Sequence, residues 1–327
     1  MQYKSIKGVS GWGQLGILLG FSGAGLILAG LAQVGIGMQL VPGGLPPGKM
    51  NEAILEALVK PENVNYARAA QLIGTFFMFF LPAMACCWIA YGKNTFWLGF
   101  NRHINALQVI TGFFIIFFAN MMAQPLSELS HQILVHFPSL NEYAQKLEDI
   151  YTDQVKVLSN LKGWGEFVAA LFIMAFFPAV FEEVFFRGAL QNLFERWTRS
   201  PLFALLFASF IFSLIHMSVF LFLSRFVLGI ALGLMYQRSK NLWVNIIAHF
   251  LNNSMALIQL FWITQHNKKI EVDKLDPDFP LWAGLVAAAF CVGLFILFEK
   301  ISKRNRKQID FEEQNLLEQA TVSAVST

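Results

Sequence analysis

The chain has 327 residues, of which 56% are hydrophobic and only 14% charged, and its formal net charge is +3. A soluble domain carries about 25% charged residues, and a globule this apolar would expose more hydrophobic surface than soluble monomers tolerate. The composition therefore excludes an ordinary soluble protein and predicts lipid as the solvent for much of the surface. The small positive charge, spread mainly between apolar runs, argues against a nucleic-acid partner.

Long apolar runs are the main feature of the chain. A bilayer core roughly 30 Å thick is crossed by about 20 apolar residues of helix. In chain order, the candidate runs are Leu15–Leu40, Ala69–Ala90, Ile104–Met122, Phe167–Phe186, Leu202–His216, Val219–Tyr236, Leu242–Ile263 and Leu281–Phe298. They predict an all-α fold, a polytopic transmembrane helix bundle with about eight transmembrane helices. The first run is too long for a signal peptide and is expected to be retained.

Two of the connections are long: one joins the first run to the second, and the other joins the third run to the fourth. The first, residues 41–68, contains a short amphipathic segment at Asn51–Val59. In the second, residues 124–163, mostly apolar residues recur every three or four positions between Tyr143 and Leu158, which predicts a helix lying on the membrane or on the bundle. Residues 1–309 are expected to form a single transmembrane domain, with its functional core at about 165–260. The polar tail 310–327 is expected to be flexible and cytoplasmic.

The distribution of basic residues predicts the orientation in the membrane. If the N-terminus is inside, three short loops that carry Lys or Arg lie on the same side as both termini, in agreement with the positive-inside rule. These loop residues are Lys93, Arg102, Arg196, Arg199, Arg238 and Lys240. We therefore expect an integral, multi-pass membrane protein with both termini in the cytoplasm. The cysteines Cys86, Cys87 and Cys291 lie in apolar runs at no metal-ligand or redox spacing and are interpreted as small buried hydrophobes.

The first informative polar group is Glu182-Glu183-x-x-x-Arg187, at the end of the fourth run. A charge at the bilayer centre costs roughly 2.5–3.5 kcal/mol on insertion scales, so such residues usually mark function. Glu183 and Arg187 are four residues apart on a helix and can neutralise each other. Glu182 lies about 100° away around the helix and has no local partner. An interfacial salt-bridge cluster would explain the pair but not Glu182.

Two further groups follow in the chain. His216 ends the fifth run, and His249 and Asn253 lie four residues apart in the seventh. Each alone is more often a structural residue, but together with the glutamates they form a complete set for hydrolysis by activated water. Glu182, His216 and His249 are also a standard catalytic zinc set. Zinc-dependent and metal-free chemistry both remain open at this point.

These motifs resemble a known family. Glu182-Glu183-x-x-x-Arg187, Phe212-x-x-x-His216 and His249-x-x-x-Asn253 are similar, in order and setting, to the three signature motifs of the CPBP intramembrane proteases. That family includes type II CAAX prenyl endopeptidases and bacterial relatives linked to bacteriocin self-immunity. The resemblance spans roughly Phe167–Leu257. The other helices resemble the family only in being transmembrane.

The resemblance implies a role for each motif residue. Glu182 and His216 would activate the water, and His249 and Asn253 would form the oxyanion site. Glu183 and Arg187 would be supporting, with Arg187 fixing the acidic pair, so that the candidate catalytic residues are Glu182, Glu183, His216, His249 and Asn253. It also implies an intramembrane endopeptidase with a peptide or membrane-protein substrate, which in part of the family is prenylated. Zinc dependence is disputed for the family, and we favour the metal-free version.

Alternative functions remain open. A proton-coupled transporter could use the same carboxylates and histidines as a proton relay, although no internal repeat is found. A catalytically silent immunity or scaffold protein is a third reading. Arg225, within the sixth run, could pair with a glutamate, line the cavity or bind a substrate carboxylate.

Overall fold

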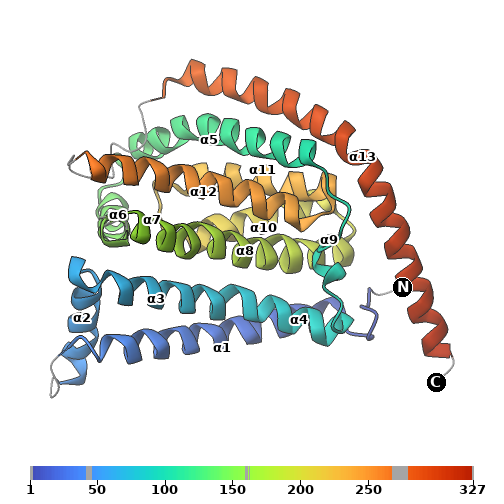
Figure 1. Cartoon of the computed structure of the whole chain (residues 1–327), viewed down its shortest axis with the longest axis horizontal. Coiled ribbons are helices and arrows are strands. Elements are labelled where there is room, and N and C mark those ends of the chain that lie inside the picture. Colours follow the sequence, from blue (N-terminus) through green and yellow to red (C-terminus); the bar gives the residue numbers. More distant parts are fainter. Residues whose placement is uncertain (1–2, 42–45, 159–160, 162, 267–278, 326–327) are drawn as a thin grey trace.

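The computed structural model describes residues 3–41, 46–158, 161, 163–266 and 279–325 (Figure 1). Within these ranges the chain is helical, and its one β-type contact is an isolated bridge between Lys4 and Ser10. The elements are α1 Gly11–Gly37, α2 Pro47–Leu58, η1 Pro61–Asn63, α3 Val64–Thr75, η2 Phe76–Phe80, α4 Leu81–Tyr91, η3 Thr95–Leu98, α5 Ala106–Leu134, α6 Pro138–Leu158, α7 Trp164–Ala170, η4 Leu171–Phe176, α8 Phe177–Glu183, η5 Val184–Gln191, α9 Asn192–Thr198, α10 Pro201–Ile215, α11 Phe222–Ser239, α12 Leu242–Gln265 and α13 Leu281–Val325.

The predicted all-α polytopic bundle is confirmed. Each predicted apolar run lies largely within helix, and six helical stretches are long and apolar enough to cross a membrane. The six are Gly11–Gly37, Pro61–Tyr91, Ala106–Leu134, Trp164–Thr198, Leu242–Gln265 and Leu281–Val322. α10 is apolar but shorter, at 15 residues, and α11 has 18. The protein is an integral membrane protein.

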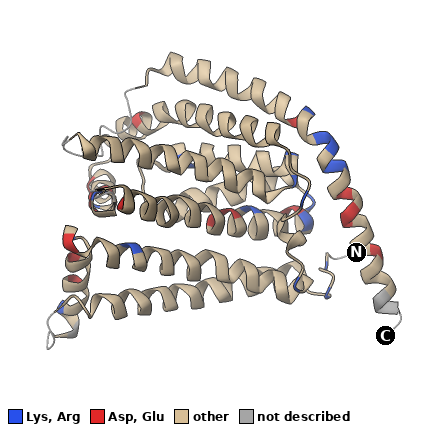
Figure 2. Cartoon of the chain, viewed as in Figure 1, with Lys and Arg blue, Asp and Glu red and all other residues tan. Residues whose placement is uncertain are grey.

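Charged residues gather at the two ends of the bundle (Figure 2). One end, here called the α9 end, carries α9 and the starts of α5 and α12; the opposite end, here called the α6 end, carries α2 and α6 (Figure 1). Few charged segments lie between the two ends, and the α8 helix carries most of those visible. A charge in apolar surroundings must be compensated, so the residues of α8 and η5 need partners from neighbouring helices.

Polar residues define where several helices begin. The Ser10 hydroxyl accepts from the Gly13 N–H at the start of α1. Asn105 forms a capping box with Gln108 at the start of α5, and Asn241 accepts from the Trp243 N–H at the start of α12. These side chains satisfy backbone N–H groups that have no partner within the helix. The Asn241 cap also fixes where α12 begins, and therefore the depth of the polar residues on that helix.

Two membrane-spanning helices contain wide, π-helical turns. η2 ends two residues before Pro82 and η4 ends two residues before Pro178. Proline lacks an N–H and its ring collides with the preceding turn, and an extra residue in that turn relieves the collision. η5 is also π-helical and follows Glu183 directly. Such turns are frequent at functional sites.

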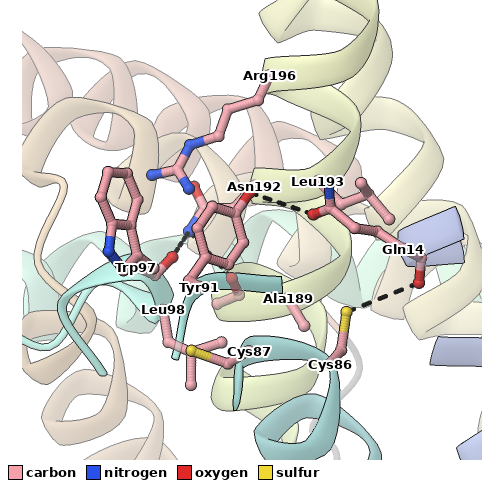
Figure 3. A pocket seen from close by; sticks show the side chains of 11 residues that line it. Gln14, Cys86, Cys87, Tyr91, Trp97, Leu98, Ala189, Asn192, Leu193 and Arg196 are labelled. Carbon is pink, nitrogen blue, oxygen red and sulfur yellow. Dashed lines mark hydrogen bonds between the residues drawn. The ribbon is translucent and has the colours of Figure 1, made fainter. Parts of the chain in front are cut away.

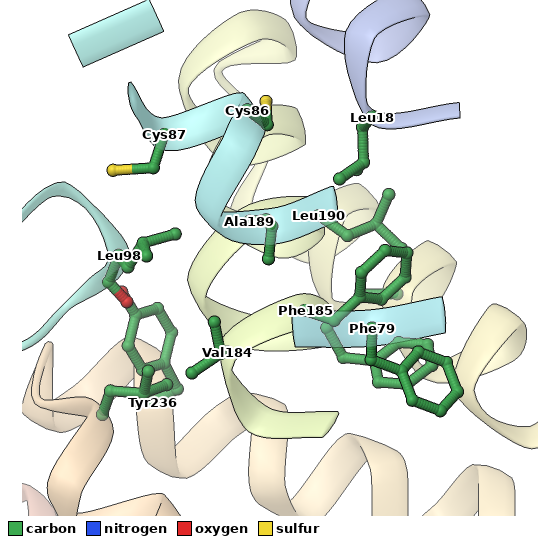
Figure 4. Packing of buried hydrophobic residues seen from close by; sticks show 14 of the residues in the cluster. Leu18, Phe79, Cys86, Cys87, Leu98, Val184, Phe185, Ala189, Leu190 and Tyr236 are labelled. Carbon is green, nitrogen blue, oxygen red and sulfur yellow. The ribbon is translucent and has the colours of Figure 1, made fainter. Parts of the chain in front are cut away.

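An aromatic core joins the N-terminal helices to the helix that carries the glutamates (Figure 4). Phe79 of η2 packs against Phe185 and Phe186 of η5, with ring centroids 5.5 and 5.6 Å apart. Leu18 of α1 and Phe212 of α10 belong to the same cluster. This packing fixes the rotation of η5, and therefore the directions in which its neighbouring glutamates point.

The predicted helix in the second long connection is α6, and it lies on the bundle. It covers the turn between α10 and α11, where the Ser218 hydroxyl donates to Glu148 of α6 at 2.8 Å. Phe220 packs in a cluster with Ala144 and Leu134. The turn contains Met217 at φ 53°, and α11 begins only at Phe222, three residues later than predicted.

The C-terminal segment differs from the expectation of a flexible tail at 310–327. α13 continues as helix to Val325 and passes the α9 end of the bundle (Figure 1). Arg196 pairs with Glu313 and His103 with Glu312, each at 3.3 Å. Leu316 packs against the aromatic core. Composition alone misled the prediction, because these polar residues have partners on other helices.

A small pocket at the α9 end is separate from the predicted site residues (Figure 3). The Arg196 guanidinium lies over the rings of Trp97 and Tyr91, at 4.8 and 5.5 Å from their centroids. Cys86 and Cys87 line the same pocket and are buried. Both cysteines, and Cys291, therefore occupy buried positions as predicted.

Candidate active site

The three predicted motifs are brought together at mid-depth of the bundle by α8, η5, α10 and α12. Glu182 and Glu183 end α8, Arg187 follows in η5, and His249 lies two turns into α12. His216 caps the C-terminal end of α10. The site is built from the middles and ends of helices that are far apart in the sequence.

Glu183 is the centre of the polar network. Its side chain is fully buried, and its carboxylate accepts from Arg187 Nη1 at 2.6 Å and from Asn245 Nδ2 at 3.1 Å. His249 Nδ1 lies 3.0 Å from the same carboxylate. Three donors satisfy this carboxylate, and one of them, Arg187, also forms a buried ion pair with it. Glu183 therefore organises its neighbours and is not available to a substrate.

Arg187 links the site to two further helices. Its Nη2 donates to the Gly229 carbonyl of α11 at 3.2 Å, and its guanidinium lies 4.7 Å from the centre of the Phe212 ring of α10. Ion pair, hydrogen bond and ring contact together fix the side chain. The pairing of Glu183 with Arg187 and the supporting position of Arg187 agree with the sequence prediction.

Glu182 differs from Glu183 in its exposure and in its hydrogen bonding. Its side chain is 12% exposed, and among the described residues its carboxylate accepts no hydrogen bond. The nearest cationic candidate is His249, whose Nε2 is 4.0 Å from Glu182 Oε2. Glu182 therefore presents an accessible carboxylate beside an imidazole, within an otherwise apolar bundle.

The tautomer of His249 follows from its partners. An ionised carboxylate can only accept, so Nδ1 carries the proton that Glu183 receives as a hydrogen bond. In the neutral ring, Nε2 then has a free lone pair on the side of Glu182. This geometry favours His249 as an acceptor, whereas the resemblance assigns it to the oxyanion site.

His216 is fixed by its own helix. Its Nδ1 lies 2.6 Å from the Phe212 carbonyl, so Nδ1 donates and Nε2 is the unprotonated nitrogen of the neutral ring. The carbonyl of His216 accepts from Arg225 Nη1 at 3.2 Å. Within the described residues His216 forms no hydrogen bond or ion pair with Glu182, although the resemblance pairs these two residues. The structure brings Glu182 together with His249 instead.

Asn253 lies one helical turn beyond His249 on α12. Its side chain is half-buried, and it makes no hydrogen bond to the part of the chain that the structure describes. Its amide is therefore available to a ligand. The neighbouring Asn252 accepts from Asn120 of α5 and so joins two helices.

Asn245 is a site residue that the sequence prediction did not include. It donates to Glu183 and, at 2.7 Å, to the Leu232 carbonyl of α11. Asn245, His249 and Asn253 are spaced by four residues and share one face of α12. That four-residue spacing is the signal in the sequence that could have identified Asn245.

The zinc set considered from the sequence is not assembled in this arrangement. The described residues contain no group of three His, Cys, Asp or Glu side chains placed to hold one metal ion. Glu182 Oε2 and His249 Nε2 are 4.0 Å apart, whereas His216 forms no ion pair with either glutamate in the described part of the chain. We therefore derive no step of the chemistry through a metal.

The fold and site define an all-α integral membrane protein with an accessible carboxylate–imidazole pair inside its bundle. Residues 164–255 match the family model described as type II CAAX prenyl endopeptidase Rce1-like. The resemblance to the CPBP proteases is confirmed over this segment, which includes all three motifs. The match supports an intramembrane endopeptidase of the CAAX type. No curated protein and no solved structure matches the chain.

Proposed function

We propose that the protein is an intramembrane endopeptidase in which Glu182 and His249 activate the attacking water. One observation supports the proposal above the others: Glu182 Oε2 and His249 Nε2 face each other at 4.0 Å, and neither atom has a hydrogen bond to a described residue. A water at about 2.8 Å from both atoms fits this separation. Its two O–H groups would point to the two acceptors, which leaves a lone pair for attack.

The proposed reaction is hydrolysis of a peptide bond. Glu182 takes one proton from the water while the oxygen attacks the scissile carbonyl. The C–N bond then breaks, and the proton passes to the leaving amine. The second proton of the water passes from the new carboxyl group to the amine, so the products are a carboxylate and an ammonium group. Glu183 holds the His249 ring through Nδ1, so its contribution is orientation.

Two further residues complete the proposed machinery. The Asn253 amide would donate to the oxyanion that forms on the carbonyl, and such a donor typically contributes about 10²–10³ in rate. His216, with its Nε2 unprotonated in the neutral ring, would relay the proton toward the leaving amine. In this proposal His249 takes the water-activating role that the resemblance gives to His216, and His216 becomes a proton relay in place of that role. Zinc binding by Glu182, His216 and His249 stays a proposal, and it is separately testable.

The first test compares the wild type with Glu182→Gln. Both proteins are purified in detergent and incubated with a quenched peptide library that includes farnesylated C-terminal peptides. We expect Glu182→Gln to lower the cleavage rate by at least about 10²-fold. Glu142→Gln, an exposed carboxylate of α6 that pairs with Lys146, is the matched control and should cleave at the wild-type rate.

Undiminished cleavage by Glu182→Gln would contradict the mechanism. Chelator treatment of the wild type in the same assay decides whether the chemistry needs a metal. If no peptide is cleaved but the reconstituted protein carries out proton-coupled uptake, the transporter alternative is favoured. The prenylated peptides test whether the substrates of the matched family extend to this chain.

A further inference from the structure

The position of Arg225 follows from the register of two helices. Arg187 donates to the carbonyl of Gly229, and Gln191 donates to the carbonyl of Gly233 at 3.0 Å. Both pairs are separated by 42 residues, so η5 and α11 run parallel in constant register. The same offset places Arg225 level with Glu183. Arg225 therefore lies at the depth of the glutamate pair, on the face of α11 that packs against η5.

Two contacts hold the guanidinium of Arg225 in place. Nη1 donates to the His216 carbonyl at 3.2 Å, and the ring of Tyr151 on α6 lies 5.0 Å from the guanidinium carbon. The side chain is half-buried, and its remaining N–H groups have no hydrogen-bond partner among the described residues. None of those groups is sealed from solvent. One edge of the guanidinium is therefore fixed and another edge is open.

The charge of Arg225 has no direct counterion in the described residues. Arg187 pairs with Glu183 and Arg196 with Glu313, whereas no carboxylate lies within 4.0 Å of Arg225 in the same parts of the chain. Glu148, on the same helix as Tyr151, accepts from Ser218 instead. A charged side chain within a membrane bundle that has no ion-pair partner is by that fact a candidate functional residue.

We propose that Arg225 binds a carboxylate of the substrate and so sets the distance from that carboxylate to the bond that is cut. The inference rests on the proposed endopeptidase function. The open, planar guanidinium edge suits bidentate recognition of a carboxylate. The carboxylate is either the C-terminal α-carboxylate or an acidic side chain close to the scissile bond. Arg225 is then a specificity residue of the same site.

The test measures peptide binding and cleavage separately. The probes are a farnesylated peptide with a free C-terminal carboxylate, its C-terminal amide, and the amide with Glu as its last residue. Equilibrium binding is measured on the Glu182→Gln protein, in which no turnover is expected, with and without Arg225→Gln. Arg238→Gln, also on α11 and half-exposed in a pair with Glu299, is the matched control.

We expect the free-carboxylate peptide to bind at least 10-fold more tightly than the amide. Arg225→Gln should remove that preference by weakening only the carboxylate peptide, and Arg238→Gln should preserve it. If the Glu-amide peptide binds tightly, Arg225 recognises a carboxylate of either kind. If it binds weakly, Arg225 recognises the C-terminal α-carboxylate. With Glu182 intact, Arg225→Gln should raise KM for the carboxylate peptide and leave kcat within about 2-fold, because the lost contact is made equally in the ground and transition states.

Equal affinity for the carboxylate and amide peptides, or binding of neither, overturns the inference. A fall of kcat for both peptides on Arg225→Gln, without a change in preference, also overturns it, because it would show that Arg225 acts on Glu182. A preserved binding preference without any cleavage overturns the proposed endopeptidase function but retains the carboxylate site. The two proposals can therefore fail independently.

Discussion

Two adjacent glutamates have opposite environments in this protein. Glu183 is fully buried and receives three donors, whereas Glu182 is partly exposed and receives none from the described residues. Consecutive residues on a helix point about 100° apart. One carboxylate is therefore directed into the polar network and the other into the space beside His249. Under the proposed function, Glu183 then has the structural role and Glu182 the chemical one.

This division predicts that Glu→Gln substitution at one position lowers stability and at the other lowers activity. Glu183→Gln leaves Arg187 buried without its carboxylate, which is expected to cost about 3–5 kcal/mol of stability. Thermal unfolding in detergent should show a clear fall in Tm. Glu182→Gln should lose activity while keeping the wild-type Tm, because Glu182 has no ion-pair partner within 3.5 Å to lose. Glu299→Gln, half-exposed in its pair with Arg238, is the control and should change stability by about 0–1 kcal/mol.

A similar Tm for Glu183→Gln and the control would contradict the assigned role of Glu183. Retained stability together with lost activity in Glu183→Gln would instead indicate that Glu183 takes part in the chemistry directly.

The residue-level prediction from sequence was successful where spacing within one helix decided the outcome. The i, i+4 rule gave the pairing of Glu183 with Arg187 and left Glu182 without a partner. It could not give the partner of Glu182, because contacts between helices depend on rotation and depth. His249, and not His216, occupies that position. Asn245 was missed for the same reason: its donation to Glu183 crosses from α12 to α8.

At the scale of elements, the close approach of α10 and α11 supports the site. A Cβ on Gly229 would lie 3.0 Å from the Ser209 Cβ and 3.1 Å from its Cα. The carbonyl of Gly229 also accepts from Arg187. Only a residue without a side chain allows α10 to pack this close to the carbonyl that binds Arg187.

We therefore expect Gly229→Ala to separate the two helices and weaken the contact with Arg187. Overpacking of this kind typically costs about 1–3 kcal/mol, and both Tm and cleavage rate should fall. Gly20→Ala on α1, where an added Cβ meets nothing within 4 Å, is the matched control. The control should keep the wild-type Tm or raise it slightly, since Ala favours helix over Gly. Equal behaviour of the two variants would refute the packing argument.

Composition predicted the apolar helices reliably, but it did not predict the one segment whose order depends on contacts with other helices. Every predicted apolar run corresponds to a helix, because apolar length alone specifies a membrane span. The segment 310–325 was predicted as a flexible tail and is part of α13 instead. Its order depends on Glu312, Glu313 and Leu316 meeting other helices, and a composition of polar residues carries no information about such partners.

At the scale of the whole molecule, loop charges predict that the α9 end faces the cytoplasm. Lys303 of α13 follows Ser302, which accepts from Gln108 at the start of α5, so Lys303→Cys lies at this end, whereas Lys146→Cys lies on α6 at the other end. Both positions are exposed. A membrane-impermeant thiol reagent should label Lys146→Cys from outside intact cells and Lys303→Cys only in inverted vesicles. The native cysteines are buried and should give little background. Labelling with the opposite sidedness would invert the orientation.

The short hairpin of α10 and α11 has a consequence for the surrounding lipid. Fifteen residues of helix reach about 22 Å, which is less than a bilayer core of roughly 30 Å. The turn at Ser218 therefore ends below the α6-side surface, and α6 covers it there. Lipid beside this hairpin meets a hydrophobic mismatch, which a bilayer relieves by thinning locally. A thinner bilayer at that edge shortens the path by which water and the polar part of a substrate reach Glu182. If the proposed cleavage takes place, we expect it to be faster in membranes of short acyl chains than in membranes of long ones, and cleavage assays in bilayers of defined thickness would measure the difference.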